Sequence, residues 1–292
     1  MFCVPAPAKI NLFLHVGPRR ADGYHALQSL VCFAEAGDAL RFAPAETFSL
    51  SVEGPFAKGL SGEEDNLILR AGRALAAHAG VRAGAAMTLT KNLPVASGIG
   101  GGSADAAAAL RGLVKLWGLS PSETELRDIA LSLGSDVPVC LKSVPAMMEG
   151  RGEHVTPVSA LPNCAMVLVN PGVAVSTAEV FRRLGRTAAD RLRVTPAPPG
   201  SRGGLPALLD YLADTCNDME PAARAIAPEI GDVLDALRGE GATLARMCGS
   251  GATCYGLFES DAAANKAAGV LSASHPQWWV APTRVAGMDI AR

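Results

Sequence analysis

The sequence has few aromatic residues, no long apolar run and no excess of basic side chains. Aromatic residues make up only 5% of the 292 residues, so we do not expect a core built mainly from stacked rings. No run of about 18 apolar residues occurs, which argues against a membrane span. The 26 Lys and Arg are balanced by 28 Asp and Glu, and the formal net charge is −2. This balance argues against a protein that binds nucleic-acid backbone through a basic surface.

The cysteines and histidines form no pattern typical of a metal site or a disulfide framework. The seven cysteines are scattered and odd in number, with no C-x-x-C pair, and the five histidines lack H-E-x-x-H spacing. No metal-ligand set is therefore predicted, and reduced thiols in the cytoplasm are expected. The first residues do not resemble a signal peptide, because they lack a basic stretch and carry Lys9 and Asn11 among apolar residues.

Hydrophobic residues, at 49% of the chain, are sufficient for a substantial core, and the length suggests about two domains. Strand-like and helix-like segments alternate irregularly, which favours an α+β fold over a regular doubly wound sheet. Residues 66–78 and 105–118 are predicted helices, and Ser120 with Glu123 is predicted to form a capping box for the next helix. Residues 221–238 are predicted to form one helix.

Four of five consecutive positions between a predicted strand and a predicted helix are glycine: Gly98, Gly100, Gly101 and Gly102. Without Cβ atoms the backbone can approach a ligand closely, and the free N–H groups of the helix start face the same point. Ser103 would be the N-cap or a first-turn residue. This pattern predicts a phosphate site, with a turn that only permits tight packing as the alternative. It is not a Walker A loop, since no Lys follows, and it is not G-x-G-x-x-G.

Residues 94–104 (PVASGIGGGSA) resemble the phosphate-binding motif of the galactokinase, homoserine kinase, mevalonate kinase and phosphomevalonate kinase (GHMP kinase) superfamily. Residues 7–12 (PAKINL) are similar to its N-terminal motif, and residues 249–254 (GSGATC) to its C-terminal glycine motif. Residues 21–25 (ADGYH) and 133–138 (LGSDVP) resemble one branch. That branch phosphorylates a cytidine diphosphate-linked methylerythritol in the non-mevalonate isoprenoid pathway.

The resemblance implies a two-domain α+β GHMP kinase fold. Residues 1–158 would form an N-terminal, ribosomal protein S5-like domain that binds the ATP phosphates, and residues 159–292 a C-terminal α/β domain on the substrate side. ATP and Mg²⁺ are the implied cofactors. The implied ATP-binding residues are Pro94, Val95, Ala96, Ser97, Gly98, Ile99, Gly100, Gly101, Gly102, Ser103 and Ala104, with Asn66, Leu67 and Lys91 by position near adenine.

An alcohol kinase also needs positive charge at the transferred group and an acceptor for the hydroxyl proton. From its strand alone, Lys9 could be an exposed edge lysine, and Asp136 after Gly-Ser could be a turn or capping residue. The resemblance implies that Lys9 and Asp136 are catalytic, with Asp136 as the base.

The remaining expected residues would bind the second substrate. Asn11 follows Lys9 by two positions and so points to the same side of a strand. In the resembled branch Tyr24 would stack on cytosine, His25 would hydrogen-bond to it and Phe181 would supply a second ring, although alone Phe181 reads as helix core. The complete set of substrate-side candidates is Asn11, Tyr24, His25, Thr177, Phe181, Gly249, Ser250 and Gly251.

Other functions stay open at this level. A homoserine or mevalonate kinase of the same superfamily would not use a base-stacking clamp, and a non-catalytic ligand sensor would not need both Lys9 and Asp136. An RNA-binding protein with an S5-like fold conflicts with the net charge of −2. We therefore expect a small-molecule substrate, with neither nucleic acid nor membrane as a partner.

Overall fold

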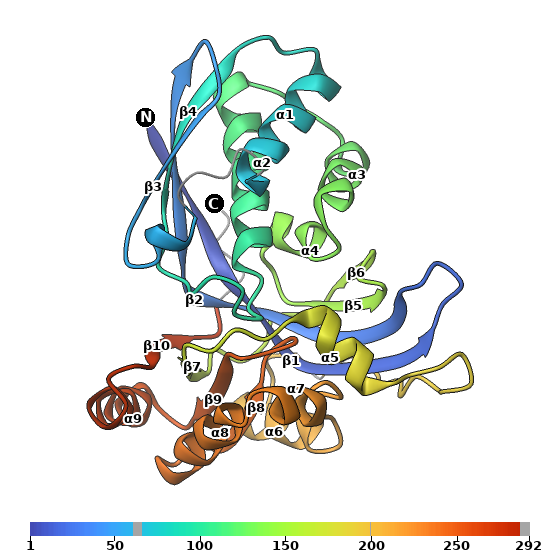
Figure 1. Cartoon of the computed structure of the whole chain (residues 1–292), viewed down its shortest axis with the longest axis vertical. Helices are drawn as coiled ribbons and strands as arrows, with labels where there is room; N and C mark the ends of the chain where they lie inside the picture. The colour runs from blue at the N-terminus through green and yellow to red at the C-terminus, as the bar shows by residue number, and fades with distance from the viewer. Residues whose placement is uncertain (61–65, 199, 287–292) are drawn as a thin grey trace.

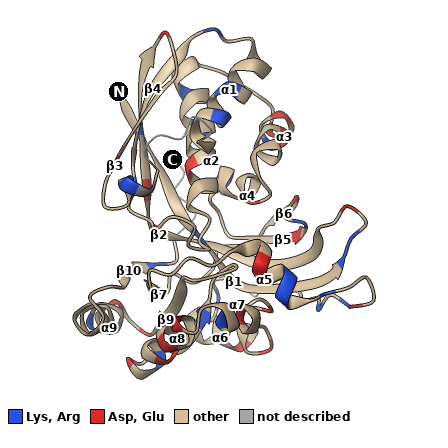
Figure 2. Cartoon of the chain, in the orientation of Figure 1, with Lys and Arg blue, Asp and Glu red and all other residues tan. Residues whose placement is uncertain are grey.

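The computed structural model describes residues 1–60, 66–198 and 200–286, and it contains two β-sheets, each with its own helices (Figure 1). The first sheet has the order β3-β4-β2-β5-β6, with β1 paired to β2, and the second has the order β10-β7-β9-β8. No helix in the described ranges is long and apolar enough to cross a membrane. Acidic and basic residues are interspersed along the chain (Figure 2).

The first sheet and its helices come from the first half of the chain, and α2 packs against β1 and β2. Its elements are β1 (Phe2–Arg19), β2 (His25–Ala45), β3 (Ser49–Glu53), η1 (Ala57–Gly59), α1 (Leu67–Ala79), β4 (Gly84–Thr90), α2 (Gly101–Trp117), α3 (Glu123–Leu133), α4 (Val137–Lys142), β5 (Ala146–Gly150) and β6 (His154–Pro157).

Small side chains allow α2 to approach the sheet closely. Ala106, Ala107, Ala108 and Ala109 are fully buried in the core of this half, and Gly112 faces the ring of Phe42 so closely that a Cβ there would overlap it. The abundance of Gly and Ala therefore serves close packing of helix on sheet in this half of the molecule.

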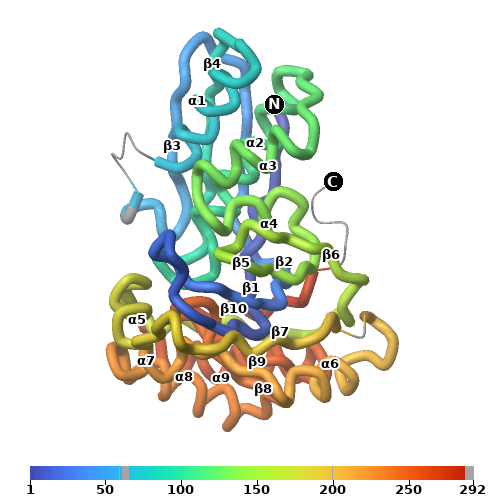
Figure 3. Tube along the Cα trace, turned by 90° about the vertical axis from the view of Figure 1, so that its right-hand side faces the viewer, coloured from blue at the N-terminus to red at the C-terminus, as the bar shows by residue number. Residues whose placement is uncertain are grey.

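The second sheet and the remaining helices form the other half, which lies below the first in both Figure 1 and Figure 3. Its elements are β7 (Ala165–Asn170), α5 (Thr177–Leu184), α6 (Gly204–Ala213), α7 (Glu220–Ile226), α8 (Glu229–Gly239), β8 (Leu244–Met247), β9 (Cys254–Phe258), α9 (Asp261–Ser274) and β10 (Trp279–Arg284).

Strands β1 and β2 join the two halves through a shared core. Ile10 and Leu12 of β1 belong to the same buried cluster as Leu168 of β7 and Tyr255 of β9. The Tyr255 hydroxyl donates to the Leu12 carbonyl oxygen over 2.7 Å. As a result β1, which pairs with β2 alone in its own sheet, is covered by the second half.

A buried arginine reinforces this junction. The Arg246 guanidinium, on β8, donates to the carbonyl oxygens of Leu12, Leu212 and Thr215 and to the Thr215 hydroxyl, at 2.7–3.3 Å. A buried guanidinium whose N–H groups are bonded in this way satisfies backbone oxygens that water cannot reach.

The helices predicted over residues 66–78 and 105–118 are confirmed: α1 has Asn66 as its N-cap residue and Gly80 as its C-cap residue, and α2 starts earlier than predicted, at Gly101, and has Gly118 as its C-cap residue. The predicted capping box is wrong by two residues. Ser122 and Glu125 form it, because the S-x-x-E pattern occurs twice in overlapping positions, and Glu123 instead pairs with Lys142.

The predicted helix over residues 221–238 is also wrong, because the chain forms α7 and α8 with a break at Ala227 and Pro228. Proline has no N–H to donate, and its ring clashes with the preceding helical turn. Pro228 therefore ends one helix and becomes the N-cap residue of the next.

We predict that Arg246→Met lowers the free energy of unfolding by about 3 kcal/mol or more, because it removes four buried, charge-assisted hydrogen bonds of 2.7–3.3 Å. Urea unfolding measures the change. Arg238→Met is the matched control: this side chain is 51% exposed and pairs with Asp235 at the surface, so its loss should cost less than about 1 kcal/mol. Equal effects of the two substitutions would contradict the structural role of Arg246.

Candidate active site

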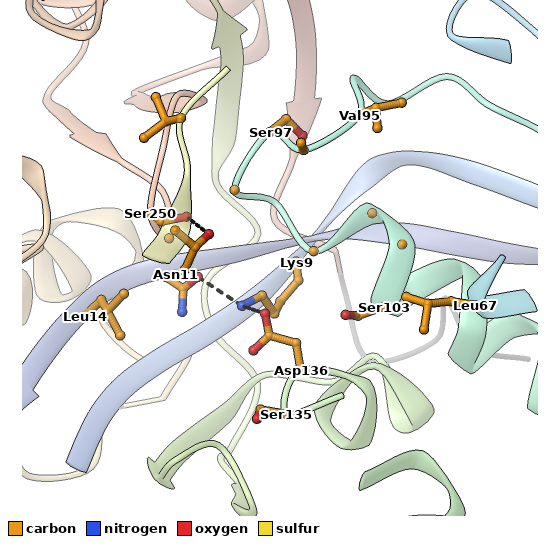
Figure 4. Close-up of a pocket in the computed structure, with 18 of the residues that line it drawn as sticks. Lys9, Asn11, Leu14, Leu67, Val95, Ser97, Ser103, Ser135, Asp136 and Ser250 are labelled. Atoms are coloured by element: carbon orange, nitrogen blue, oxygen red, sulfur yellow. Dashed lines mark hydrogen bonds and ion pairs between the residues drawn. The ribbon is translucent and has the colours of Figure 1, made fainter. Parts of the chain in front are cut away.

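A cavity of about 650 Å³ lies where the two halves meet, and most of the predicted site residues line it (Figure 4). Its walls come from β1, the loop before α2, the turn before α4, helix α5 and the turn between β8 and β9. Segments more than 200 residues apart in sequence therefore contribute to one site.

The glycine loop, residues 94–104, forms one wall and leads into α2. Gly98 and Gly100 have φ of +80° and +64°, values that favour glycine, and Gly100 is the N-cap residue of α2. Ser103 lies in the first turn, one of its two expected positions. The first N–H groups of a helix have no intrahelical acceptors, so the start of α2 presents donors beside the cavity. This geometry is suited to an anion.

The glycine loop rests against a second glycine turn, residues 249–251. A Cβ on Gly98 would lie 2.5 Å from the Gly251 carbonyl oxygen, and the Thr253 N–H donates to the Ser97 carbonyl oxygen over 3.1 Å. On its other side, the Ile99 carbonyl oxygen accepts from the Lys9 N–H over 2.9 Å. The loop is thus held between β1 and the β8–β9 turn.

Lys9 and Asp136 form an ion pair beside this loop, with 2.9 Å between Nζ and Oδ2. Lys9 is 3% exposed, whereas the Asp136 side chain is 37% exposed and opens to the cavity. Burial, the largest single effect, would lower the pKa of Lys9, but the charge and hydrogen bond of Asp136 together with smaller effects of the Cys248 and Cys140 thiols outweigh it, and the pKa is raised. Lys9 is therefore a charged, buried lysine and not an exposed edge lysine.

Hydrogen bonds fix the orientation of both groups. Asn11 Oδ1 accepts from Lys9 Nζ over 3.2 Å, while Asn11 Nδ2 donates to Ser29 Oγ over 2.8 Å. Asp136 precedes α4 at its N-cap position, yet its side chain makes no capping hydrogen bond. Its carboxylate is directed at Lys9 instead, which decides between the capping interpretation and an interaction within the site.

The other end of the cavity carries the aromatic residues. The rings of His25 and Phe181 stack with centroids 5.0 Å apart and planes 17° apart. His25 Nδ1 is buried and has no partner among the described residues. Burial, aided by Arg19 and Arg186, lowers the pKa of His25, so the ring is neutral at pH 7 and has one nitrogen able to accept a hydrogen bond.

Tyr24 lies near this pair but is half exposed, and the Arg151 guanidinium lies 5.2 Å from the centre of its ring. Thr177 Oγ1 and Ser250 Oγ are 2.8 Å apart, so α5 is connected to the second glycine turn. This end therefore combines flat rings with polar groups, a surface on which a planar heterocycle can stack and be oriented.

Three predicted residues do not line the cavity: Ile99, Ala104 and Gly251 are buried behind it. All the others do line it. Asn66 also caps α1, accepting from the Ile68 N–H over 2.9 Å, and the Lys91 ammonium is paired with Asp38 and Asp105.

Two charged residues line the cavity wall without a role predicted from the sequence: Asp105, to which no catalytic part was assigned, and Arg151, which was missed. Asp105 is the sole charged residue of the segment 101–110, and a carboxylate on the buried side of an alanine-rich helix was a signal that could have been used. Arg151 lies in the turn between β5 and β6, and nothing local distinguished it from other surface arginines.

Comparison with known proteins agrees with this geometry. Residues 66–143 match the N-terminal domain of the GHMP kinases, and residues 200–277 match their C-terminal domain. A 4-diphosphocytidyl-2-C-methyl-D-erythritol kinase of Parvibaculum lavamentivorans is 53% identical over 97% of both chains, and one of Paramagnetospirillum magneticum is 52% identical over 97% of this chain and 98% of that protein.

Solved structures show the same similarity. A crystal structure of 4-(cytidine 5'-diphospho)-2C-methyl-D-erythritol kinase superposes with a TM-score of 0.78 at 33% identity, covering 98% of this chain and all of that one. The L. major mevalonate kinase superposes with a TM-score of 0.70 at 18% identity, over 98% and 96% of the two chains. At that identity the second similarity concerns the fold alone.

We predict that Gly98→Ala destabilises the protein by about 2 kcal/mol or more. The alanine would have to adopt the positive φ of this position, which is unfavourable for it, and its Cβ would meet the backbone of the second glycine turn. The shift of the urea midpoint measures this effect. Gly102→Ala is the control, since its Cβ would meet no atom nearer than 3.6 Å, at Leu67, and it should change stability by less than about 1 kcal/mol. A Gly98→Ala variant as stable as Gly102→Ala would contradict the close approach of the two segments.

Proposed function

The chain belongs to the 4-diphosphocytidyl-2-C-methyl-D-erythritol kinases of the GHMP kinase family, and from this premise we propose how its cavity carries out the reaction. The protein is an ATP-dependent small-molecule kinase of the non-mevalonate isoprenoid pathway, and it phosphorylates the 2-hydroxyl of its cytidyl substrate. The observation that carries the proposal is the Lys9–Asp136 pair, which lies between a glycine loop and an aromatic end of one cavity.

The glycine loop and the start of α2 would hold the ATP phosphates. Backbone N–H groups and the helix dipole supply positive potential without a basic surface, which is consistent with the net charge of −2. Asn66, Leu67 and Lys91 line the same part of the cavity and are assigned to the adenosine side.

Asp136 would accept the proton of the substrate 2-hydroxyl as its oxygen attacks the γ-phosphorus. The bond between the γ-phosphorus and the β–γ bridging oxygen then breaks, and ADP leaves with that electron pair. Lys9, 2.9 Å from Asp136, would keep the carboxylate oriented and would offset negative charge on the transferred group. Asn11 would hold the Lys9 ammonium in place.

The aromatic end would bind the cytosine base. Phe181 and His25 already stack, Tyr24 offers a half-exposed ring, and the unpartnered His25 Nδ1 can accept from an exocyclic amino group. Thr177, with Ser250 in the turn at residues 249–251, would line the path of the remaining substrate. Homoserine and mevalonate have no base that could use these rings.

Mg²⁺ would accompany the ATP phosphates and offset their charge. Among the residues that the structure describes, no group of three or more His, Cys, Asp or Glu side chains is arranged to hold a metal ion. We therefore assign it no set of protein ligands.

We also propose that residues 1–158 and 159–292 form two domains and that the protein is cytoplasmic. The division is supported by the separate sheets on either side of it. The location is supported by cysteines that are all free thiols.

We predict that Asp136→Asn lowers kcat by about 100-fold or more, while the dissociation constant for ATP changes less than about threefold. Coupled ADP-release kinetics with the cytidyl substrate, together with equilibrium binding of ATP, separate the two effects. Asp128→Asn on α3, whose side chain is 65% exposed, is the matched control and should behave as the wild type. Near-normal turnover by Asp136→Asn would refute the assignment of the base.

We predict that Phe181→Leu raises KM for the cytidyl substrate about fivefold, since it removes an aromatic contact of roughly 1 kcal/mol, and leaves KM for ATP unchanged. Phe48→Leu is the control, because Phe48 packs against Trp117 in the other half of the molecule.

The same assay should detect no phosphorylation of homoserine or mevalonate by the wild type. Turnover of either alcohol in place of the cytidyl substrate would overturn the proposed specificity.

A further inference from the structure

A buried cluster of three charged groups lies directly behind the glycine loop. Lys91 Nζ is 2.5 Å from Asp38 Oδ2 and 2.8 Å from Asp105 Oδ2, and the three residues are 2–3% exposed. They come from the end of β4, from β2 and from α2. If both carboxyl groups are ionised, the cluster carries a net negative charge in a site that water reaches poorly.

Hydrogen bonding distinguishes the two carboxyl groups. Asp38 Oδ1 accepts from the N–H groups of Asn92 and Leu93, over 2.6 and 2.8 Å, so both oxygens of Asp38 have donors. Asp105 uses Oδ2 for Lys91, but its Oδ1 is buried and has no partner among the described residues. A buried carboxylate oxygen without a donor is costly, whereas a protonated carboxyl group carries no net charge.

The cluster is close enough to interact electrostatically with a charged ligand at the glycine loop. A Cβ on Gly101, the first residue of α2, would lie 3.1 Å from Lys91 Nζ and 3.7 Å from Asp38 Oδ2. Lys91 and Asp105 line the cavity together with the loop. Phosphate groups bound at the loop would therefore add negative charge next to a cluster that already has an excess of it.

We infer that Asp105 is a positioning residue that takes up a proton when nucleotide phosphates bind at the glycine loop, which leaves Lys91 and Asp38 as a neutral pair beneath the bound nucleotide. This inference rests on the proposed function of the loop. The proton comes from solvent and returns to it when the nucleotide dissociates, and no covalent bond to the nucleotide forms or breaks. Without this uptake, the ionised Asp105 would repel the phosphates across a poorly screened distance.

The surroundings of Asp105 support a proton at neutral pH. Burial raises its pKa, Lys91 lowers it and Asp38 raises it, with a resulting pKa of about 7. Among the described residues, the Cys140 thiol on α4 is a further titratable group near Asp105, and burial, with a smaller contribution from Asp105, raises its pKa to about 12, so it stays neutral. Lys91 itself remains charged, because attraction to both carboxyl groups outweighs the effect of burial and its pKa is raised.

The direction of the pH dependence follows from the charges. Negative phosphates favour the protonated form, so the pKa of Asp105 is higher in the complex than in the free enzyme, and the complex holds more protons. Nucleotide affinity is then greatest below pH 7 and falls as the pH rises above it. A merely structural Asp105 would leave the affinity independent of its own protonation.

The test is calorimetric titration of the wild type and of Asp105→Asn with ADP, in two buffers of different ionisation enthalpy at pH 7.5. We expect the wild type to take up about 0.3–0.8 proton more per ADP than Asp105→Asn, and its dissociation constant to rise at least about threefold more between pH 6.5 and 8.5. Protonation of ADP itself is common to both proteins and cancels in the comparison. Asp128→Asn should follow the wild type.

Equal proton uptake and equal pH profiles for wild type and Asp105→Asn would overturn the inference and leave the proposed kinase function intact. Absence of ADP binding to the wild type would overturn both.

A carboxyl ¹³C NMR titration of the wild type labelled at aspartate keeps the test valid if Asp105→Asn fails to fold. One aspartate should titrate near pH 7 and at higher pH with ADP, and an ADP complex in which every aspartate titrates below about pH 5.5 would also overturn the inference.

Discussion

The close approach of two glycine segments is the constraint on which this site depends. Gly98 and the turn at residues 249–251 meet backbone to backbone, at separations that leave no room for a Cβ atom. This contact brings the loop before α2 against the turn between β8 and β9, and both line the same cavity. A side chain at Gly98 would separate the walls of the cavity, so these glycines are needed for the shape of the site as well as for the anion binding that we propose.

Strand β1 connects this contact to the rest of the site, because it packs against both halves of the molecule. It pairs with β2 in the first sheet, packs against β7 and β9 through Ile10 and Leu12, and donates from the Lys9 N–H to the glycine loop. Lys9 is thereby buried between the glycine loop and Asp136, and one strand determines the position of the ammonium relative to both.

The two buried lysines of this site are each paired with carboxylates inside the protein. Lys9 is paired with Asp136, and Lys91 with Asp38 and Asp105. Each ammonium keeps its charge in spite of burial because a carboxylate lies within 3 Å. A near-neutral chain can therefore hold a highly charged ligand, with the backbone N–H groups at the start of α2 supplying the local positive potential.

The sequence by itself determined the features that depend on near neighbours along the chain: most helices and strands, the glycine loop and the order of the family motifs. Where two local signals competed, the prediction was wrong by about one helical turn or less. The overlapping S-x-x-E patterns displaced the capping box by two residues, and Pro228 divided a segment predicted as one helix into two. Tertiary structure alone decided which charged groups share a buried environment. Residues 9 and 136, or 38, 91 and 105, meet because separate strands and helices pack together, and neither their distances nor the missing partner of Asp105 Oδ1 can be read from spacing in the sequence.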